Sequence, residues 1–456
     1  MRSKSSKVYW MNARSTSVET SLVPKMLTVF DAAGFDRLVK PKDLVAIKLH
    51  CGEWNNTNYL RPVYARALAD RVKALGGRPF VCDTTTLPYS TYPGRVTGLD
   101  FFTTAERNGY SPAVLGCPFV CADGFMGTDD FRVDLPEGYI LKEAYIATAI
   151  AAADVLITLT HFKGHVTGVI GGAVKNLGIG AQSKRGKFNV HMGRHPRYGM
   201  TGAAKPGRGH GKRRNGINWT LLEDSCPWGL IHAKNGSIEW DQEKCPGCRG
   251  CLALMTSLGF IELDDSNQEA TNAAIADACL ATIKAVGKRK VAFINLALDV
   301  SPGCDCVNYG DMPLVPHLGV FASHDPVAID KACIDKATEA MGISGSVAAE
   351  KGAATAGARK FETCSSRVPG ISEEIQLATG EIIGLGSRRY ELVEVPEGKP
   401  EDFAFGPDPR PVGVRLRAKF AKFPPFPPGG RNGGNYVRKD EIDLDRVNTA
   451  RTHQHR

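Results

Sequence analysis

The chain repeatedly alternates short apolar runs with longer amphipathic runs, and this limits its choice of fold more than any other feature. The first apolar run, residues 43–50, precedes an amphipathic segment that opens at Arg61-Pro62 and ends at Gly76-Gly77, and a second apolar run follows at 78–83. Proline in the first turn and glycine past the end are typical boundaries of a helix. A strand, helix, strand order predicts parallel pairing of the two strands.

The same alternation continues along the chain. A helical pattern over 141–153 leads into an apolar strand at 154–160, and a second helical pattern over 270–286 leads into a strand at 290–297. A later helix opens at Asp325-Pro326, where Asp325 is a natural N-cap and proline fits the first helical position. We interpret Asp330, further along that helix, as a surface residue. The fold class predicted is α/β, with a mostly parallel sheet flanked by helices.

Four cysteines have the spacing of one cluster of a bacterial two-cluster ferredoxin. Cys226 precedes a proline, and Cys245, Cys248 and Cys251 form a Cys-x2-Cys-x2-Cys run. In such ferredoxins the run supplies three thiolates to one [4Fe-4S] cluster and a distant Cys-Pro supplies the fourth. The ligands of the other cluster would fall at positions that hold Gly216, Trp219, Leu222 and Met255. Loss of one complete set predicts a single [4Fe-4S] cluster.

A structural zinc site is the alternative use of four thiolates. Zinc sites usually combine two Cys-x2-Cys pairs, whereas a triplet with a distant Cys-Pro favours iron and sulfide. Thirteen cysteines are an odd number, and the N-terminus lacks the apolar segment of a secretory signal, so disulfides are disfavoured. Because no run of about 18 apolar residues is present, we expect no membrane span and a cytoplasmic protein of reducing, anaerobic cells.

Composition and pattern together suggest the organisation of the chain. At 456 residues and 43% hydrophobic content it can bury a large core. The cysteine segment interrupts the alternation, so we assign an α/β body to 1–215 and 263–395 and a ferredoxin-like insertion to 216–262. Residues 396–456 form a Pro/Gly-rich basic tail. Such a tail is typically disordered or extended, and we expect it to contact another subunit of an oligomer or larger complex.

The net charge of +9 is unevenly distributed. Residues 184–214 hold ten Lys or Arg residues and no Asp or Glu, which favours an anionic partner. Sparse aromatics and the absence of a known motif disfavour nucleic acid. This basic stretch could bind an acidic redox partner or a phosphate-bearing small molecule, or it could be a plain solvated loop.

A glycine-rich stretch after the 154–160 strand carries the remaining chemistry. Ligands of open α/β sheets bind beyond the carboxyl ends of strands. Glycines let backbone N–H groups approach an anion, and Lys and His add charge and proton transfer. We therefore predict a flavin, nucleotide-type or substrate site here, against the alternative of a solvated turn. The candidate cofactor-binding residues are Gly171, Gly172, Lys175 and Asn176, and the candidate catalytic residues are Lys163, His165, Lys175 and His191.

These residues carry a family resemblance. His-Phe-Lys-Gly-His at 161–165, Gly-Gly-Ala-Val-Lys-Asn-Leu-Gly-Ile-Gly at 171–180, Cys-Asp-Cys at 304–306 and Ser-His-Asp-Pro-Val-Ala-Ile-Asp at 323–330 resemble the DUF362 family. The resemblance covers most of 40–395 and implies an iron–sulfur protein with an α/β body and an inserted ferredoxin-like segment. This chain departs from many such proteins in having one cluster set, a longer basic stretch and an added tail.

The order His161, Gly171-Gly172, Lys175 and His191 is also similar to the lactate-racemase-like proteins. That similarity implies a nickel-pincer nucleotide attached at Lys175, with His161 or His191 as a proton-transfer base. This chain has two residues rather than one between Gly172 and Lys175.

Cys304 and Cys306 follow the 290–297 strand, so we expect them near the same edge of the sheet as Lys163 and Lys175. They could ligate a second metal, form a reactive dithiol, or pack as small apolar groups. The other seven cysteines are expected in the core.

The sequence therefore predicts an iron–sulfur electron-transfer protein that uses one [4Fe-4S] cluster with a redox partner protein. One alternative is an oxidoreductase that binds a substrate or cofactor at residues 163–191. Another is a non-catalytic subunit of a larger assembly.

Overall fold

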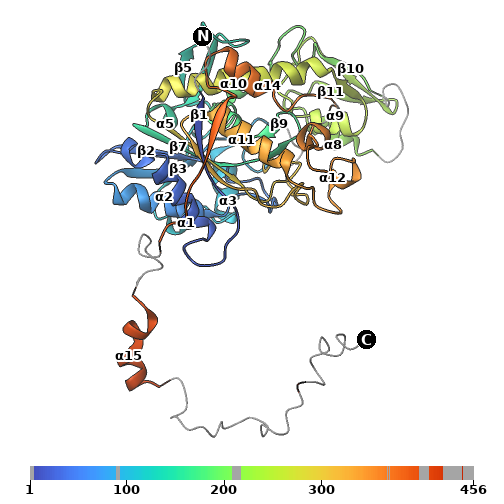
Figure 1. The fold of residues 1–456 in the computed structure, drawn as a ribbon. Helices are drawn as coiled ribbons and strands as arrows, with labels where there is room; N and C mark the ends of the chain where they lie inside the picture. Colours follow the sequence, from blue (N-terminus) through green and yellow to red (C-terminus); the bar gives the residue numbers. More distant parts are fainter. Residues whose placement is uncertain are drawn as a thin grey trace. The chain divides into compact units, whose positions relative to one another are not determined.

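The computed structural model describes residues 5–88, 93–207, 217–366, 368, 370–399, 410–424 and 444. Residues 1–400 form one compact unit and residues 401–456 form a second (Figure 1).

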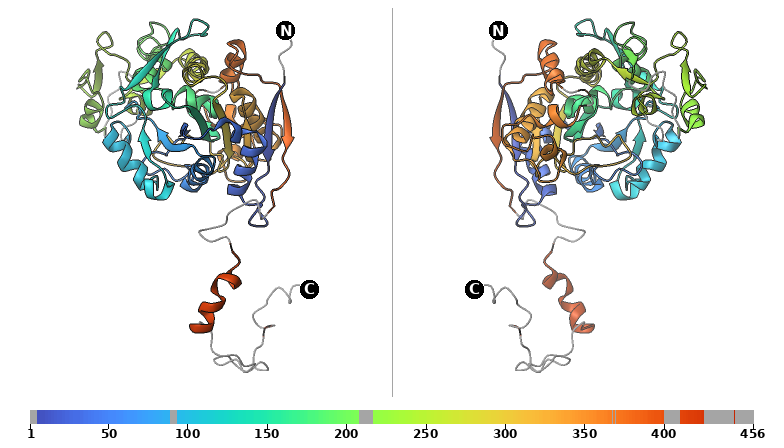
Figure 2. Two further views of the ribbon diagram at one scale, coloured as in Figure 1. Left: turned by 90° about the vertical axis from the view of Figure 1, so that its left-hand side faces the viewer. Right: turned by 90° about the vertical axis from the view of Figure 1, so that its right-hand side faces the viewer.

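An eight-stranded sheet lies at the centre of the first unit, in the order β16-β1-β15-β14-β7-β2-β3-β4. Its five consecutive strands from β14 to β4 are parallel. β15 is antiparallel to both of its neighbours, and β1 and β16, from distant parts of the chain, pair in parallel at one edge (Figure 2). The bounds are β1 Ser6–Met11, β2 Leu44–Lys48, β3 Arg78–Asp83, β4 Phe119–Cys121, β7 Val155–His161, β14 Val291–Ala297, β15 Gly319–Ser323 and β16 Tyr390–Glu394. The predicted α/β class with a mostly parallel sheet is confirmed.

Helices cover both faces of this sheet. Alternate side chains of one strand enter opposite cores: Val45 and Ile47 pack on one face, whereas Ala46 packs on the other. β7 is buried along its whole length, as a continuous apolar run requires of a central parallel strand. One face is covered by α1 Leu22–Ala32, α2 Pro62–Ala74, α3 Gly98–Arg107 and α4 Pro112–Leu115. The other is covered by α6 Ala173–Gly178, α10 Asp265–Val286, α11 Pro326–Glu339 and α14 Ile375–Ile382.

Short elements connect this framework. They are η1 Phe35–Leu38, the hairpin β8 Lys163–His165 with β9 Val169–Gly171, α7 Lys184–Val190, α12 Val347–Glu350 and α13 Lys360–Cys364.

Several helix boundaries lie where the sequence placed them. Arg61 caps α2, with proline at its first position and Gly76 beyond its end at φ +84°. The side chain of Asp325 accepts hydrogen bonds from the N–H groups of Val327 and Ala328 at the start of α11.

The predicted helix at 141–153 is wrong for most of its length. Residues Glu143–Ala147 form β6, which pairs antiparallel with β5 Asp130–Asp134, and only Thr148–Ala151 form a short helix, α5. Ala144 and Ile146 are buried, whereas Glu143 and Tyr145 are half-buried. This two-residue period suits a strand, and Tyr and Ile at 145 and 146 favour one.

Asp330 is also placed differently from our interpretation, because it is fully buried. Its carboxylate accepts hydrogen bonds from Ala173 N (2.7 Å) and Val174 N (2.9 Å) at the start of α6, and from Asn295 Nδ2 (2.7 Å). A Cβ added at Gly172 would lie 2.3 Å from Asp330 Oδ1, so this carboxylate fits only against glycine. Asp330 therefore ties α11 and β14 to the glycine-rich turn.

The cysteine segment forms a small layer of its own. It contains β10 Ala204–Pro206 paired with β13 Ile261–Leu263, the hairpin β11 Ile231–Lys234 with β12 Ser237–Trp240, and the helices α8 Trp219–Asp224 and α9 Leu252–Ser257 (Figure 1). Leu222 and Met255, at two positions of the missing cluster set, are buried in its hydrophobic core. Apolar packing occupies those two positions.

In the second unit, the described residues include a helix that the predicted extended tail did not contain, α15 Val412–Lys422. The Pro/Gly-rich 425–430 and most of the other tail residues lie outside the described residues, as do 208–216 of the basic stretch and its junction with the insertion.

None of the helices in the described part of the chain has the length and apolar character needed to cross a membrane.

We predict that Asp330→Ala lowers the free energy of unfolding by about 3 kcal/mol, because it leaves two backbone N–H groups and one amide buried without their acceptor. Urea denaturation measures this. Asp70→Ala, at an exposed residue of α2, should change stability by under about 0.5 kcal/mol, and an equally small effect at Asp330 would contradict the assigned role.

Candidate functional site

A cavity of about 130 Å³ lies at the carboxyl ends of three parallel strands. Lys48 of β2, Asp83 of β3 and His161 of β7 form its floor, where strand ends of a parallel sheet converge. All the residues predicted in the glycine-rich stretch line this one cavity: Lys163, His165, Gly171, Gly172, Lys175, Asn176 and His191. The structure thus brings together side chains from the β8–β9 hairpin, α6 and the end of α7.

Asp83 organises one side of the cavity. Its carboxylate lies 3.0 Å from Lys48 Nζ, 3.0 Å from His50 Nδ1 and 3.8 Å from Arg95 Nη1. Burial opposes ionisation of Asp83, but Lys48, His50 and Arg95 hold its pKa well below the usual range. Arg95 also pairs with the buried Glu53 at 3.2 Å. This is an extended buried ion-pair network.

Asp305 organises the opposite side. It is fully buried and lies 2.8 Å from His161 Nδ1 and 3.0 Å from Lys163 Nζ. Burial opposes its charge, yet His161 and Lys163 lower its pKa to about 2. The other ring nitrogen of His161 is 2.7 Å from the Leu298 carbonyl. Both nitrogens of His161 are therefore engaged, which disfavours the proton-transfer role that the lactate-racemase-like similarity implied for this residue.

The glycine-rich stretch binds an internal anion. The N–H groups of Ala173 and Val174, which we expected to approach a ligand, donate to Asp330 instead. Asn176 accepts from Lys48 Nζ at 2.9 Å and donates to Thr160 Oγ1 at 2.9 Å, so it tethers α6 to two strands. Lys175, in contrast, extends to Cys304, where its Nζ lies 3.3 Å from Sγ.

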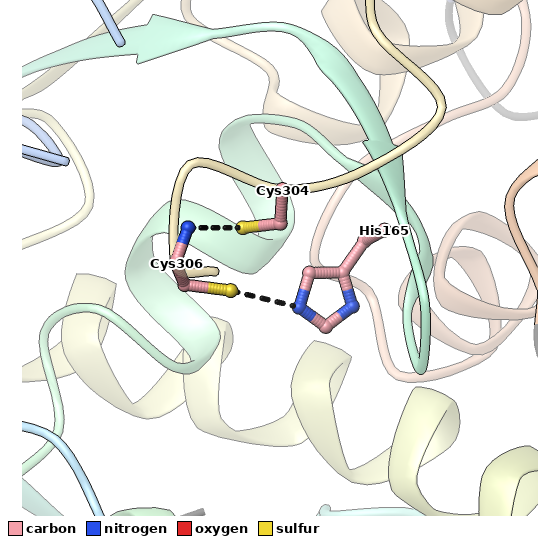
Figure 3. A group of neighbouring side chains, drawn as sticks. All are labelled: His165, Cys304 and Cys306. Carbon is pink, nitrogen blue, oxygen red and sulfur yellow. Dashed lines mark hydrogen bonds between the residues drawn. The ribbon is translucent and has the colours of Figure 1, made fainter. Parts of the chain in front are cut away.

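Cys304 and Cys306 meet His165 beside the cavity (Figure 3). Cys306 N donates to Cys304 Sγ at 3.4 Å, and Cys306 Sγ lies 3.6 Å from His165 Nε2. Burial and Lys175 lower the pKa of His165 to about 4, so its ring is neutral near pH 7. The expected proximity of the cysteine pair to the Lys163 and Lys175 loop is therefore observed.

Lys187, Arg249 and His191 line the cavity on the side of α7 and the cysteine layer. Burial lowers the pKa of Lys187 to about 8, which places its proton exchange near neutral pH. Arg249 Nη1 lies 3.1 Å from His191 Nδ1. Because a guanidinium only donates, Nδ1 accepts and His191 is neutral; burial and Arg249 hold its pKa well below the ordinary value.

The four cysteines of the ferredoxin-like pattern belong to the same segment as Arg249 and Leu252, which line the cavity. Cys245 and Cys251 are buried, whereas Cys226 and Cys248 are half-buried. Backbone N–H groups donate to two of the sulfurs, from Leu230 to Cys226 at 3.2 Å and from Gly247 to Cys245 at 3.4 Å. Burial raises the pKa of Cys251 to about 12, and the three other thiolates add to this rise. A bound metal cation would favour the thiolate form of such cysteines.

The spacing of the sulfurs bears on which metal fits. Among the described residues, the groups with three ligand atoms within 4.8 Å of one another are His165-Cys304-Cys306 and His50-Cys51-Asp83, and the four cysteines are not among them. A single zinc ion with bonds of about 2.3 Å would hold its sulfurs about 3.8 Å apart. In a [4Fe-4S] cluster each thiolate binds a different iron, which keeps the sulfurs farther apart. The four-thiol donor set is therefore compatible with such a cluster, and no three of its sulfurs lie as close together as a single zinc ion would hold them.

The group of His50, Cys51 and Asp83 does not suit a metal. The carboxylate of Asp83 is already paired with Lys48, and the thiol of Cys51 is buried and donates to the Gly52 carbonyl. Burial holds the pKa of Cys51 well above its ordinary value.

Sequence reasoning missed five charged residues that face the glycine-rich stretch: Lys48, Asp83, Arg95, Arg249 and Asp305. Lys48 and Asp83 gave a signal, since a charge that ends an otherwise apolar strand should lie at the ligand-binding edge.

The geometry therefore defines an α/β protein with a charged, metal-compatible site at the carboxyl edge of its sheet. The chain matches the family described as "Domain of unknown function (DUF362)" over residues 45–335, more than half of its length, and it belongs to this family.

Two further comparisons add little. No curated protein matches the chain. A solved structure of the lactate racemase apoprotein from Thermoanaerobacterium thermosaccharolyticum aligns with 64% of this chain and 51% of its own, at 13% identity and a TM-score of 0.32. The chain thus spans about half the length of that protein, and a similarity this distant carries no argument about the site.

We predict that Asp83→Asn costs about 3 kcal/mol of stability at pH 7, because it leaves buried cations without their partner. The pKa of Asp83 is lowered on folding, so its contribution is complete above the unfolded-state pKa of about 3.9 and is lost as the pH falls below it. The difference between wild type and variant should accordingly shrink in acid. Urea titrations from pH 7 to pH 3 test this, with the exposed Asp134→Asn as control; a difference that grows in acid would contradict it.

Proposed function

We propose that the protein is an iron–sulfur oxidoreductase. Cys226, Cys245, Cys248 and Cys251 would hold one [4Fe-4S] cluster that exchanges single electrons with a molecule bound in the cavity. The half-buried Cys226 and Cys248 would face the protein that supplies or removes electrons.

The observation that carries this proposal is the position of Arg249. It lies in the sequence between Cys248 and Cys251, lines the cavity and contacts His191. Leu252, next to Cys251, lines the same cavity. A cluster bound by this loop would therefore be separated from a cavity ligand by one or two side chains.

The charge of the cavity suggests what binds there. Six cationic side chains line it, together with the single carboxylate of Asp83, and the carboxylates of Glu53, Asp123 and Asp305 pair with them from behind. The cations are Lys48, Arg95, Lys163, Lys175, Lys187 and Arg249. This excess of positive charge favours an anionic ligand, such as a carboxylate or phosphate compound.

The residues of the cavity have separable roles under this proposal. Lys163 stays charged, because Asp305 and Cys304 raise its pKa against the effect of burial, and it would orient the anion. Lys187, with its pKa near 8, would exchange a proton with the ligand. The cluster, when bound, supplies or accepts one electron at a time.

A ferredoxin-like carrier that uses only a partner protein is the second candidate. Trp228, two residues after Cys226, is 57% exposed and would suit such a docking surface. The two functions differ at Lys175: a carrier retains its electron delivery after Lys175→Ala, whereas an enzyme loses turnover with its cluster intact.

The test of the cluster is anaerobic purification with iron, sulfide and zinc analysis, followed by electron paramagnetic resonance of the dithionite-reduced protein. We expect about four irons per chain, and a loss of most of this iron in Cys248→Ser. Cys121→Ser, at a half-buried cysteine outside the set, should retain it. Zinc without sulfide would overturn the proposal.

The coupling between cluster and cavity has its own test. Arg249→Met should shift the cluster potential to more negative values, because it removes a positive charge beside the cluster. Arg194→Met removes the same charge at an exposed position and should have a smaller effect. Equal shifts in the two variants, measured by redox titration of the paramagnetic signal, would count against the assigned position of Arg249.

A further inference from the structure

The proposed function leaves one reactive group unused, the Cys304, Cys306, His165 and Lys175 group beside the cavity. We propose that Cys304 and Cys306 are a redox-active dithiol that closes to a disulfide. The inference relies on the proposed function only for its electron acceptor, the iron–sulfur cluster.

The two sulfurs are within reach of each other. They lie within 4.8 Å of one another and of a ring nitrogen of His165, and the backbone N–H of Cys306 points to Cys304 Sγ (Figure 3). Cys306 lines the cavity and is half-buried, whereas Cys304 is buried behind it. To form an S–S bond of about 2 Å, the side chains of Cys304 and Cys306, which are two residues apart in one loop, would have to rotate toward each other. Cys306 is the sulfur that a cavity ligand can reach.

The surrounding charges suit a thiol paired with a thiolate. Burial opposes ionisation of Cys304, but the hydrogen bond from Cys306, together with Lys175 and Lys163, holds its pKa well below the ordinary value. The same hydrogen bond and burial hold the pKa of Cys306 well above it. The pair therefore shares one proton, and thiol–disulfide chemistry requires a thiolate of this kind.

His165 is oriented to donate to sulfur rather than to bind a metal. Its Nδ1 accepts hydrogen bonds from the N–H groups of Thr167 (3.1 Å) and Gly168 (2.7 Å). The proton of the neutral ring is consequently on Nε2, which faces Cys306. A metal would need an unprotonated Nε2, whereas an N–H group stabilises the thiolate that a broken disulfide releases.

The proposed step balances as follows. The S–S bond would form between Cys304 and Cys306 as two electrons leave one at a time to the oxidised cluster, which the redox partner protein re-oxidises after each transfer. The one proton that the thiol–thiolate pair still holds is released to water in the cavity. The second thiol proton was lost earlier, when the thiolate formed. The reverse step takes up two electrons and one proton and restores the thiol–thiolate pair. The pair would thereby store the two electrons that most organic substrates exchange.

Peptide mass spectrometry tests the dithiol directly on the full chain. Trypsin should release residues 291–331 as one peptide, in which Cys304 and Cys306 are the sole cysteines. The protein is equilibrated anaerobically in buffers of reduced and oxidised dithiothreitol, quenched with iodoacetamide and digested. We expect the peptide to change from two alkylated thiols to an internal disulfide, with a two-electron dependence on the buffer ratio. Two alkylated thiols throughout, in folded protein, would overturn the inference.

The pH dependence of alkylation distinguishes a reactive pair from buried cysteines that merely react slowly. Lys175→Met should lower the alkylation rate at pH 6 by about tenfold or more, since losing the ammonium raises the pKa of the pair. Lys205→Met, which removes an exposed lysine, should leave it unchanged. An unchanged alkylation rate in Lys175→Met would mean that the cysteines merely pack as buried thiols, and it would overturn the proposal. Zinc, nickel or extra iron at one per chain that disappears in Cys304→Ser would show that the pair binds a metal, and it would overturn the proposal as well.

The two proposals fail separately. A protein without iron whose peptide still forms the disulfide would refute the cluster and retain the dithiol. A protein with about four irons and an unreactive pair would do the reverse. Cys226→Ser, expected to lose the cluster, should still show the disulfide in dithiothreitol buffers.

Discussion

The buried carboxylate of Asp305 is the interaction on which the arrangement of the site depends. It joins His161 at the end of the central strand to Lys163 at the start of the β8–β9 hairpin, and it lies between the two cysteines in the sequence. Removing a charge from water costs several kcal/mol unless partners surround it, so the burial of Asp305 depends on its contacts with His161 and Lys163. The ion pairs thus fix the loop that carries Cys304 and Cys306, and with it their distance from Lys175.

The same reasoning applies across the cavity, where Asp83 and Asp123 each lie beside lysines. The pKa values of Lys163 and Lys187 shift in different directions. Asp305 and Cys304 keep Lys163 charged, whereas burial outweighs the more distant Asp123 and leaves Lys187 with a pKa near 8. The proposed reduction of an anionic substrate would use one cation that holds the anion and one that exchanges a proton. The unequal pairing of two lysines provides this difference.

Much of the framework could be predicted from the sequence because its elements have strong local signals. The apolar run that became β7 and the Asp325-Pro326 cap of α11 depend on periodicity and capping alone. The 141–153 segment could not be predicted in this way, because its partner strand β5 decides its structure. Asp330 shows the same limit for single residues, since its burial follows from a contact with α6 that is 157 residues away in sequence.

The candidate site, like the fold, could be predicted only where its residues are close together in sequence. The glycine-rich stretch was found because its residues are close together in sequence, and all of them line one cavity. His165 was found as a candidate catalytic residue, but its pairing with Cys306, 141 residues away, was not. Arg249 was overlooked although it lies within the most conspicuous motif, because a residue between cluster ligands gives no sign of which way it faces. Its contact with His191 is what relates the cysteine segment to the cavity.

These two long-range contacts lead to one chemical argument. A [4Fe-4S] cluster exchanges electrons singly, whereas a dithiol exchanges them in pairs. If the cluster loop reaches the cavity through Arg249 and the dithiol reaches it through Cys306, the cavity lies between a one-electron and a two-electron centre. An anionic ligand held there by Lys163 could then receive two electrons before it dissociates, so that no radical product is released. Under this proposal the insertion and the Cys-Asp-Cys element take part in the same reaction.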